Sequence, residues 1–344
     1  MANSEPILPA GKLPTELLGR LLTRQTMSDP RVIIGPRIGT DAAAIDMGDS
    51  VLVVKTDPIT FATNDAGWYL VNVNANDIAC MGAKPKWFLV TALLPEKHTT
   101  EAMVAEIFES LESASSTIGV TLVGGHTEIT IGLDRPILVG HMLGETTHDQ
   151  LLDVRSSQPG DAILLCKGIA IEGTALLARE GSDECLSNID PQLLQRASQF
   201  LTEPGISVVS AARILTGSSA AVRGMHDPTE GGLASALHEL SAAAGLSAGI
   251  HRDAIMIYPE TIAVCEALDI DPMGLISSGA LLAVIDPQDA PLAINALAQA
   301  GIPCVQIGSF TIPGNDVAYH TAEGSSAMPE FAVDEIALYF ARKA

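Results

Sequence analysis

Short apolar runs alternate with segments of helical periodicity along nearly the whole chain, and this alternation restricts the fold more than any other feature. Apolar runs at 50–57, 86–95 and 120–129 are typical of strands. Between them, apolar residues three and four positions apart predict helices at 66–82 and 100–118. Helices and strands that alternate in this way pack as layers, so the predicted fold class is α/β (α+β).

The second half of the chain shows the same alternation of strand-like and helix-like segments, which predicts a second domain. The elements expected beyond residue 130 are a strand at 135–145, a loop and strand at 156–168, a helix at 170–180, a helical region at 190–215, a strand, turn and helix at 220–245, and a helix at 288–301 between two late strands. A length of 344 residues is typical of two domains. We expect them at 1–152 and 153–344.

The charge balance excludes some classes of partner. The chain has 41 acidic and 19 basic residues, a net charge of −22, and no basic run that could follow a phosphate backbone, so no nucleic-acid partner is expected. The start of the chain lacks a signal-peptide pattern, and no apolar run reaches the roughly 18 residues of a membrane span. These features predict a soluble, cytoplasmic protein without a membrane partner.

Cysteine usage is also typical of a cytoplasmic protein. The five cysteines are scattered along the chain, with no CxxC pair and no histidine at ligand spacing. We therefore expect reduced thiols in the cores, and neither a zinc site nor a disulfide framework.

The segment "NVNANDIACMGAKP", residues 72–85, is unusually rich in side-chain oxygens for its apolar surroundings. Asn72, Asn74 and Asn76 alternate as they would in a strand, but the apolar residues around them have helical spacing. We therefore predict a helix that Pro85 ends. Its oxygens suggest a bound ligand.

Three aspartates of the first half lie where α/β proteins bind ligands. Asp41 follows a glycine-containing stretch, Asp57 ends a predicted strand, and Asp77 belongs to the oxygen-rich helix. Carboxylate oxygens together with substrate phosphates are the ligands that Mg²⁺ prefers. Each residue also has a simpler interpretation, because Asp41 could be a turn residue or helix cap and Asp57 could shape a turn before Pro58.

Two glycine pairs could let backbone N–H groups approach a phosphate closely. The first is in "GGHTE", 124–128, where the strand predicted at 120–129 runs into a glycine turn. The second is Gly231–Gly232 in "HDPTEGGLA", where the first helical turn could bind an anion. The same stretch also fits a capping box that starts at Asp227, which needs no ligand. No Walker A or GxGxxG pattern occurs, so any nucleotide site is of another type.

Lys167 adjoins a glycine after a predicted strand. Its ammonium group could neutralise a phosphate, or the residue could simply end the strand.

In their order, the motifs "GTDAAAI", "KTDPI", "NANDIACMGAKP", "GGHTE" and "DPTEGGLASALHE" resemble the aminoimidazole ribonucleotide (AIR) synthase superfamily, over about residues 11–309. Within it the chain looks most similar to the AIR synthase-related proteins and the hydrogenase maturation branch, HypE. The resemblance implies a two-domain PurM-like fold. It also implies an N-terminal domain that pairs with its twin in a homodimer with a β-barrel-like core.

The resemblance further implies that ATP and Mg²⁺ bind between the two domains. It assigns the metal ions to Asp41, Asp57, Asp77 and Asp227. It assigns nucleotide contacts to Asn76, Gly124, Gly125, His126, Thr127, Glu128, Gly231 and Gly232. Catalytic candidates are Asp57, Asp227 and Lys167.

The chain departs from the HypE pattern at several positions. HypE has a lysine, a glutamate and an arginine where this chain has Glu128, Ser278 and Glu230. It also ends in a cysteine, whereas this sequence ends "ALYFARKA" and its last cysteine is Cys304. We therefore expect a retained ATP site without dehydration of a tail thiocarboxamide.

Two classes of function remain. The first is an ATP-dependent enzyme that phosphorylates or activates an unidentified small acceptor and releases ADP. A thiamine-monophosphate-kinase-like phosphotransferase is one version, although the paired acids "GDD" of that kinase appear here as "GTD". The second is a non-catalytic nucleotide-binding partner in a maturation complex.

Overall fold

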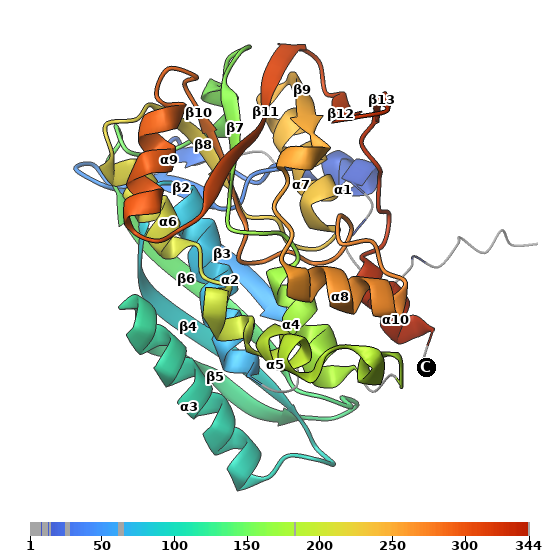
Figure 1. The fold of residues 1–344 in the computed structure, drawn as a ribbon. Helices are drawn as coiled ribbons and strands as arrows, with labels where there is room; N and C mark the ends of the chain where they lie inside the picture. Colours follow the sequence, from blue (N-terminus) through green and yellow to red (C-terminus); the bar gives the residue numbers. More distant parts are fainter. Residues whose placement is uncertain are drawn as a thin grey trace, which may run out of the picture.

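The computed structural model describes Leu8, Leu13 and residues 15–24, 28–60, 65–181 and 184–342. Within this part of the chain there are two sheets, and each packs with its own helices into one of two neighbouring units (Figure 1). This arrangement confirms the α/β class with two domains. The predicted boundary at 152/153 falls between the last strand of the first sheet and the first strand of the second.

The first sheet belongs to the N-terminal half and has the strand order β1-β2-β3-β6-β4-β5. β5 is an edge strand that runs parallel to β4. The elements of this half are α1 (Thr15–Leu22), β1 (Val32–Ile34), β2 (Ala43–Asp46), β3 (Val51–Ile59), α2 (Ala66–Cys80), β4 (Lys84–Pro95), α3 (Glu101–Ile118), β5 (Thr121–Thr130) and β6 (Ile137–Thr146).

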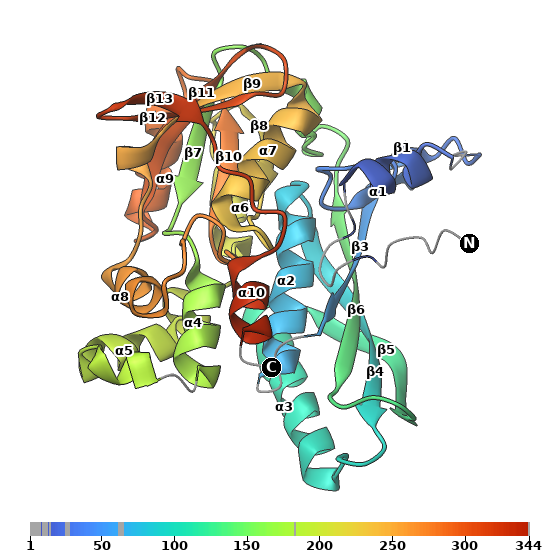
Figure 2. The ribbon, with the colours of Figure 1, turned by 90° about the vertical axis from the view of Figure 1, so that its right-hand side faces the viewer.

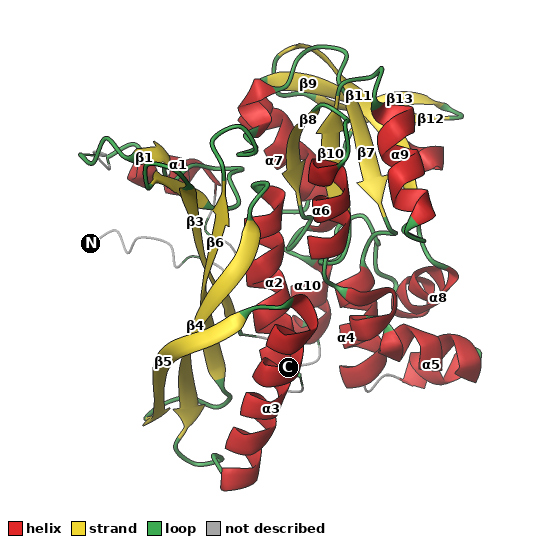
Figure 3. Cartoon of the chain, turned by 90° about the vertical axis from the view of Figure 1, so that its left-hand side faces the viewer, coloured by secondary structure: helices red, strands yellow, loops and turns green. Residues whose placement is uncertain are grey.

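Two helices cover one face of this sheet, and they differ in how many of their residues are buried because their surroundings differ. α2 lies between the sheet and the second domain, and all its residues except Trp68 are buried (Figure 2). α3 lies on the outside and buries only one stripe, including Ile107 and Leu111. Its ends have ordinary caps, since the Thr100 hydroxyl accepts from the Met103 N–H and Gly119 closes the last turn at φ 72°. Among the residues that the structure describes, no helix covers the opposite face of the sheet (Figure 3).

The second sheet has the order β13-β12-β9-β11-β7-β10-β8. Its central strands β7 and β10 are fully buried. Alternate residues of β7 face two cores, one with α4, α7 and α8 and the other with α6, α9 and the end of α2. The elements are β7 (Ala162–Cys166), α4 (Ile171–Glu180), α5 (Pro191–Gln199), α6 (Val209–Gly217), β8 (Val222–His226), α7 (Gly232–Ala244), β9 (Leu246–His251), α8 (Pro259–Leu268), β10 (Leu281–Ile285), α9 (Ala290–Gln299), β11 (Cys304–Pro313), β12 (Val317–Thr321), β13 (Gly324–Ala327) and α10 (Glu335–Ala341).

Most predicted elements are confirmed, and three local predictions are wrong. Pro85 does not end α2, which stops at Cys80, and instead lies inside β4. The glycine pair at 124–125 is not a turn but part of β5. Asp227 does not cap α7, because that helix begins at Gly232 with Gly231 as its N-cap. Among the described residues, no helix has both the length and the apolar composition needed to cross a bilayer.

The asparagines of α2 satisfy backbone groups, which corrects the interpretation that the whole oxygen-rich cluster faces a ligand. Asn72 Nδ2 donates to the carbonyl of Trp68 at 2.9 Å. Asn74 Nδ2 donates to the carbonyl of Leu70 at 2.8 Å, while its Oδ1 accepts from the Asp57 N–H at 3.0 Å. Asn74 therefore fixes the end of β3 against α2.

Asn76 connects the two domains. Its Nδ2 donates to the carbonyl of Ile206 at 2.9 Å, and its Oδ1 accepts from the Val208 N–H at 2.8 Å. Both Asn76 and the segment it binds lie in the buried junction between α2 and the start of α6. The amide therefore supplies hydrogen bonds to a backbone segment that no sheet or helix satisfies.

Candidate functional site

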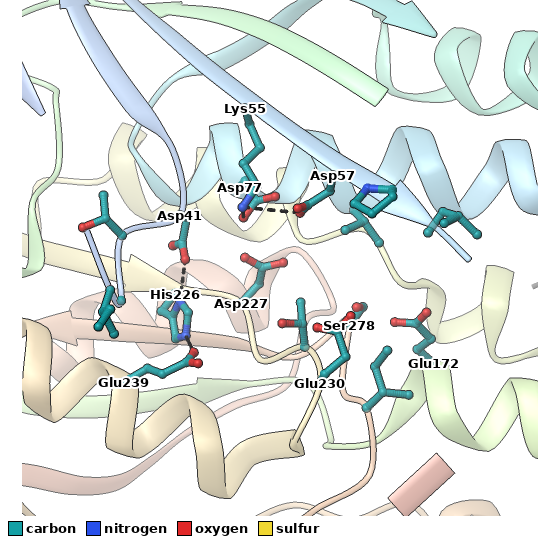
Figure 4. Close-up of a pocket in the computed structure, with 18 of the residues that line it drawn as sticks. Asp41, Lys55, Asp57, Asp77, Glu172, His226, Asp227, Glu230, Glu239 and Ser278 are labelled. Atoms are coloured by element: carbon teal, nitrogen blue, oxygen red, sulfur yellow. Dashed lines mark hydrogen bonds and ion pairs between the residues drawn. The ribbon is translucent and has the colours of Figure 1, made fainter. Parts of the chain in front are cut away.

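A cavity of about 630 Å³ lies between the two domains. The N-terminal half contributes the loop before β2, the second half of β3 and one face of α2. The C-terminal half contributes the loop between β8 and α7, the first turn of α4 and the segment before β10. Figure 4 shows that charged side chains from both halves point toward one another across this space.

Lys55 lies between the carboxylates of two aspartates of the first domain. Its Nζ is 3.1 Å from Asp77 Oδ1 and 3.3 Å from Asp57 Oδ2. Burial lowers the pKa of Lys55, but the carboxylates of Asp77 and Asp57 raise it by more, so the pKa ends above its ordinary value. Lys55 is therefore a permanent cation that balances part of the acidic charge.

Asp41 is held from the second domain by His226. His226 Nδ1 is 2.6 Å from Asp41 Oδ1, and its Nε2 is 3.3 Å from Glu239 Oε2. Burial lowers the pKa of His226, and the two carboxylates raise it well above its ordinary value. An imidazolium with a carboxylate at each nitrogen fixes the orientation of Asp41.

Asp77 and Asp227 have more negative charge around them than the neighbouring cations balance. Asp77 Oδ2 and Asp227 Oδ2 are both buried without a hydrogen-bond partner in the described part of the chain. Burial, with the nearby carboxylates, raises the pKa of Asp77 well above its usual value and that of Asp227 to about 7. Unpartnered buried carboxylate oxygens are costly. These hard oxygen donors fit a divalent cation such as Mg²⁺, which would supply the missing positive charge.

The other end of the cavity has a different character. Glu172, at the start of α4, is only 4% exposed, and its Oε2 has no hydrogen-bond partner among the described residues. Burial raises the pKa of Glu172 to about 8, against a smaller opposite effect of the Ser278 hydroxyl. The walls there are apolar and include Leu176, Ile276 and Ile336. At neutral pH this carboxyl is mostly protonated and can both donate and accept a hydrogen bond.

The structure brings together Asp41, Asp57, Asp77 and Asp227, the four aspartates predicted as metal ligands, all of which line the cavity. Asn76 and Lys167 do not line it. Lys167 is buried, and its Nζ donates to the carbonyls of Gly205 at 2.6 Å and Ser207 at 2.9 Å. Its burial lowers its pKa to about 7.

The glycines of both motifs also lie outside the cavity lining. Residues 124–128 are exposed on the edge strand β5, where the Glu128 carboxylate accepts from Thr130 and lies 3.1 Å from His126 Nε2. At the start of α7, the Gly231 N–H already donates to Asp334 Oδ2 at 2.6 Å. In this chain, the carboxylate of Asp334 therefore occupies the position that was predicted for an anion.

Sequence reasoning missed Lys55, Glu239 and Glu172 as site residues. Lys55 and Asp57 are two residues apart on β3, so their side chains share a face of the strand. That spacing could have predicted an ion pair between them. No local signal marks Glu239 or Glu172, because each reaches the cavity only through the packing of its helix.

Models of both domains of the AIR synthase related protein family match the chain, the N-terminal model over residues 39–146 and the C-terminal model over 158–320. The chain belongs to the AIR synthase-related family. As the motif order predicts, this family membership covers both halves of the molecule.

Curated relatives of this AIR synthase-related protein include hydrogenase maturation proteins. Carbamoyl dehydratase HypE of Cupriavidus necator is 30% identical over 269 residues, which cover 76% of this chain and 73% of that protein. A hydrogenase expression/formation protein of Methanocaldococcus jannaschii is 29% identical over 75% of this chain and 74% of its own length.

Solved structures share the fold. A crystal structure of the hydrogenase maturation protein HypE in complex with ATP superposes with a TM-score of 0.72 at 22% identity, over 88% of this chain and 92% of that one. HypE in its complex with HypF gives a TM-score of 0.73 at 21% identity, over 91% and 99%. These similarities confirm the predicted PurM-like two-domain fold.

Proposed function

We propose that this AIR synthase-related protein binds ATP with Mg²⁺ in the cavity between its domains and transfers the terminal phosphoryl group to a small acceptor, with release of ADP. The observation that carries the proposal is the convergence of four aspartates from both domains, two of them with unpartnered buried oxygens, on one cavity.

In this proposal, Asp41, Asp57, Asp77 and Asp227 hold Mg²⁺, which supplies the charge neutralisation that phosphoryl transfer requires. Lys55 already lies among these carboxylates and is positioned to contact a phosphate oxygen. His226 and Glu239 orient Asp41. Since phosphoryl transfer depends mainly on positioning and charge, this set of residues is sufficient without a nucleophilic side chain.

The acceptor would bind at the Glu172 end of the same cavity. The protonated carboxyl of Glu172 and the apolar walls fit an uncharged small molecule with a polar group. Glu172 and Glu230 lie at this end, whereas Lys55 and His226 lie beside the aspartates (Figure 4). None of the side chains labelled there would place a positive charge beside Glu172 for a second anionic group.

The uncovered face of the N-terminal sheet supports the homodimer that the family resemblance predicts. Leu52, Val54, Leu89 and Leu143 point away from α2 and are only half-buried in a single chain. β5 adds exposed Leu122, Val123 and Ile129 along an unpaired edge. A second copy of the sheet would cover these residues and remove the exposed edge. We expect sedimentation equilibrium to give twice the mass of one chain, and a monomer at micromolar concentration would contradict the homodimer.

A second candidate function is a nucleotide-binding partner without turnover. It is favoured by the replacement of three charged HypE positions by Glu128, Ser278 and Glu230, and by the solved complex of the related HypE with HypF. In that case the bound nucleotide would regulate assembly with a maturation protein.

Calorimetric titration with a non-hydrolysable ATP analogue, with and without Mg²⁺, tests the nucleotide site. Binding that depends on Mg²⁺ supports it, and no binding in either condition rules it out. ADP release that requires a small molecule then separates the enzyme from the non-catalytic partner, for which MgATP would change only the affinity for a maturation protein.

A further inference from the structure

One cysteine lies directly beside the aspartate cluster. Cys80 follows Asp77 by three residues on α2, so the two side chains share one face of the helix. Its Sγ is 3.6 Å from Asp227 Oδ1. One ligand atom each from Asp41, Cys80 and Asp227 lies within 4.8 Å of the others, which makes this a three-residue group from three separate elements.

The Cys80 thiol donates a hydrogen bond to Asp227 Oδ1, and the length of this bond matches the sulfur–oxygen edge of a tetrahedral metal site. With metal–sulfur and metal–oxygen bonds of about 2.3 and 2.0 Å, neighbouring sulfur and oxygen ligands are about 3.5 Å apart. The observed 3.6 Å between Cys80 Sγ and Asp227 Oδ1 is close to this value. Three protein ligands also leave a fourth position for water or a substrate oxygen.

Two further observations point to a bound ion. Asp227 is 2% exposed, yet none of the residues that the structure describes offers its Oδ2 a hydrogen bond. Asp41 and Cys80 also line a second cavity of about 20 Å³, which adjoins the large one at Gly39–Asp41 and is large enough for a single ion or water. The group therefore has an unsatisfied donor oxygen and space beside the sulfur.

We propose that Asp41, Cys80 and Asp227 form a site for a thiophilic divalent cation of the zinc class. On binding, the Cys80 thiol forms an Sγ–metal bond and releases its proton to water, so no oxidant or reductant is needed. Magnesium does not use sulfur ligands, whereas zinc and cobalt do. The sulfur therefore gives this chain a cation preference that its carboxylates alone would not have.

Because Asp41 and Asp227 are shared with the proposed Mg²⁺ site, the two cations would compete. Zinc-class ions would thus inhibit or replace Mg²⁺ at this position. The site itself does not require ATP binding or turnover.

Cobalt(II) is the probe that tests the proposal, because a cobalt–thiolate bond has a charge-transfer absorption in the near ultraviolet that carboxylate ligands lack. Titration of the full chain with Co²⁺ should give this band at one equivalent, and Zn²⁺ should remove it. The Cys80→Val variant, which keeps a buried apolar side chain, should lose the band and bind Co²⁺ at least about tenfold more weakly.

Matched variants separate this site from the other thiols. Cys185→Ser removes the exposed cysteine, and Cys265→Ser removes a buried one in another core; both should keep the band. If Cys80→Val does not fold, Cys80→Ser should also lose the band, and Asp227→Asn should weaken Co²⁺ binding. Persistence of the band without Cys80, its loss with Cys185→Ser, or its absence from the folded wild type would each overturn the proposal.

The Co²⁺ result is independent of the proposed function. A chain that shows the band but no binding of the ATP analogue would keep the thiophilic site and lose the phosphotransferase. A chain that binds MgATP without the band would keep the proposed nucleotide site and lose the thiophilic site.

Discussion

At the scale of single residues, neighbouring polar side chains of α2 have different structural roles. Asn72, Asn74 and Asn76 satisfy backbone carbonyls and N–H groups, whereas Asp77 faces the cavity with one unpartnered oxygen. The composition of the segment cannot separate these roles. The direction in which each side chain points on the helix decides them.

Replacement of Asp77 by Asn tests the cation role directly. It removes a charged ligand and keeps the shape, so affinity for the Mg²⁺ complex of an ATP analogue should fall at least about tenfold, with little change for the metal-free analogue. Calorimetry under both conditions measures the difference, and the exposed Asp49→Asn variant serves as a control. An equal loss with and without Mg²⁺ would contradict the assignment.

Lys167 gives a pH dependence of stability. Burial lowers the pKa of Lys167 from its ordinary 10.5 to about 7, so between these values the unfolded state binds more protons. The free energy of unfolding should therefore rise from pH 7 toward pH 10, by up to about 1.4 kcal/mol per unit, and this contribution is lost as pH falls through 7. Urea unfolding at pH 7.5 and 9.5 measures the rise, which should be absent in Lys167→Met. Parallel pH profiles of the two proteins would show that Lys167 is not buried in this way.

At the scale of elements, β5 shows how a glycine motif can serve packing. A Cβ atom at Gly125 would lie 1.9 Å from the carbonyl oxygen of Val90 on β4, so only glycine allows the two strands to approach this closely. The irregular pairing between Phe88 and Leu89 lies just before this contact. Strand geometry alone therefore accounts for a glycine in a motif that also suggests phosphate binding.

Gly125→Ala should lower the free energy of unfolding by about 2–3 kcal/mol, because the clash involves backbone atoms that cannot move aside. Gly217→Ala, at the end of α6 with no atom near the new methyl group, is the matched control and should change stability by at most about 1 kcal/mol. Chemical denaturation of both variants gives the comparison. Equal stabilities would mean that β5 pairs differently in solution.

At the scale of the whole molecule, the site exists only because the two domains are held together. Asp57 and Asp77 come from the first domain, whereas His226 and Asp227 come from the second (Figure 4). The buried Asn76 amide is one of the contacts that fix this arrangement.

Asn76→Ala would leave the Ile206 carbonyl and the Val208 N–H without partners. We expect a loss of about 2–4 kcal/mol in the free energy of unfolding, since each unsatisfied buried group costs about 1–3 kcal/mol. Thermal denaturation beside the exposed Asn315→Ala control measures it. An unchanged midpoint would mean that other contacts hold the domains in register.

The α/β class, the positions of most helices and strands, the family and the four aspartates that meet at the cavity were all predictable from the amino-acid sequence. These features follow from local periodicity and from motifs whose residues act through their chemical type. Three outcomes became visible only in the folded chain. Asn76 joins the two domains, Lys167 and the 124–128 motif lie outside the cavity lining, and Glu172, Glu239 and Cys80 approach the site. Each of those outcomes depends on which residues distant in the chain become neighbours, and that is set by the packing of whole elements and leaves no local pattern in the sequence.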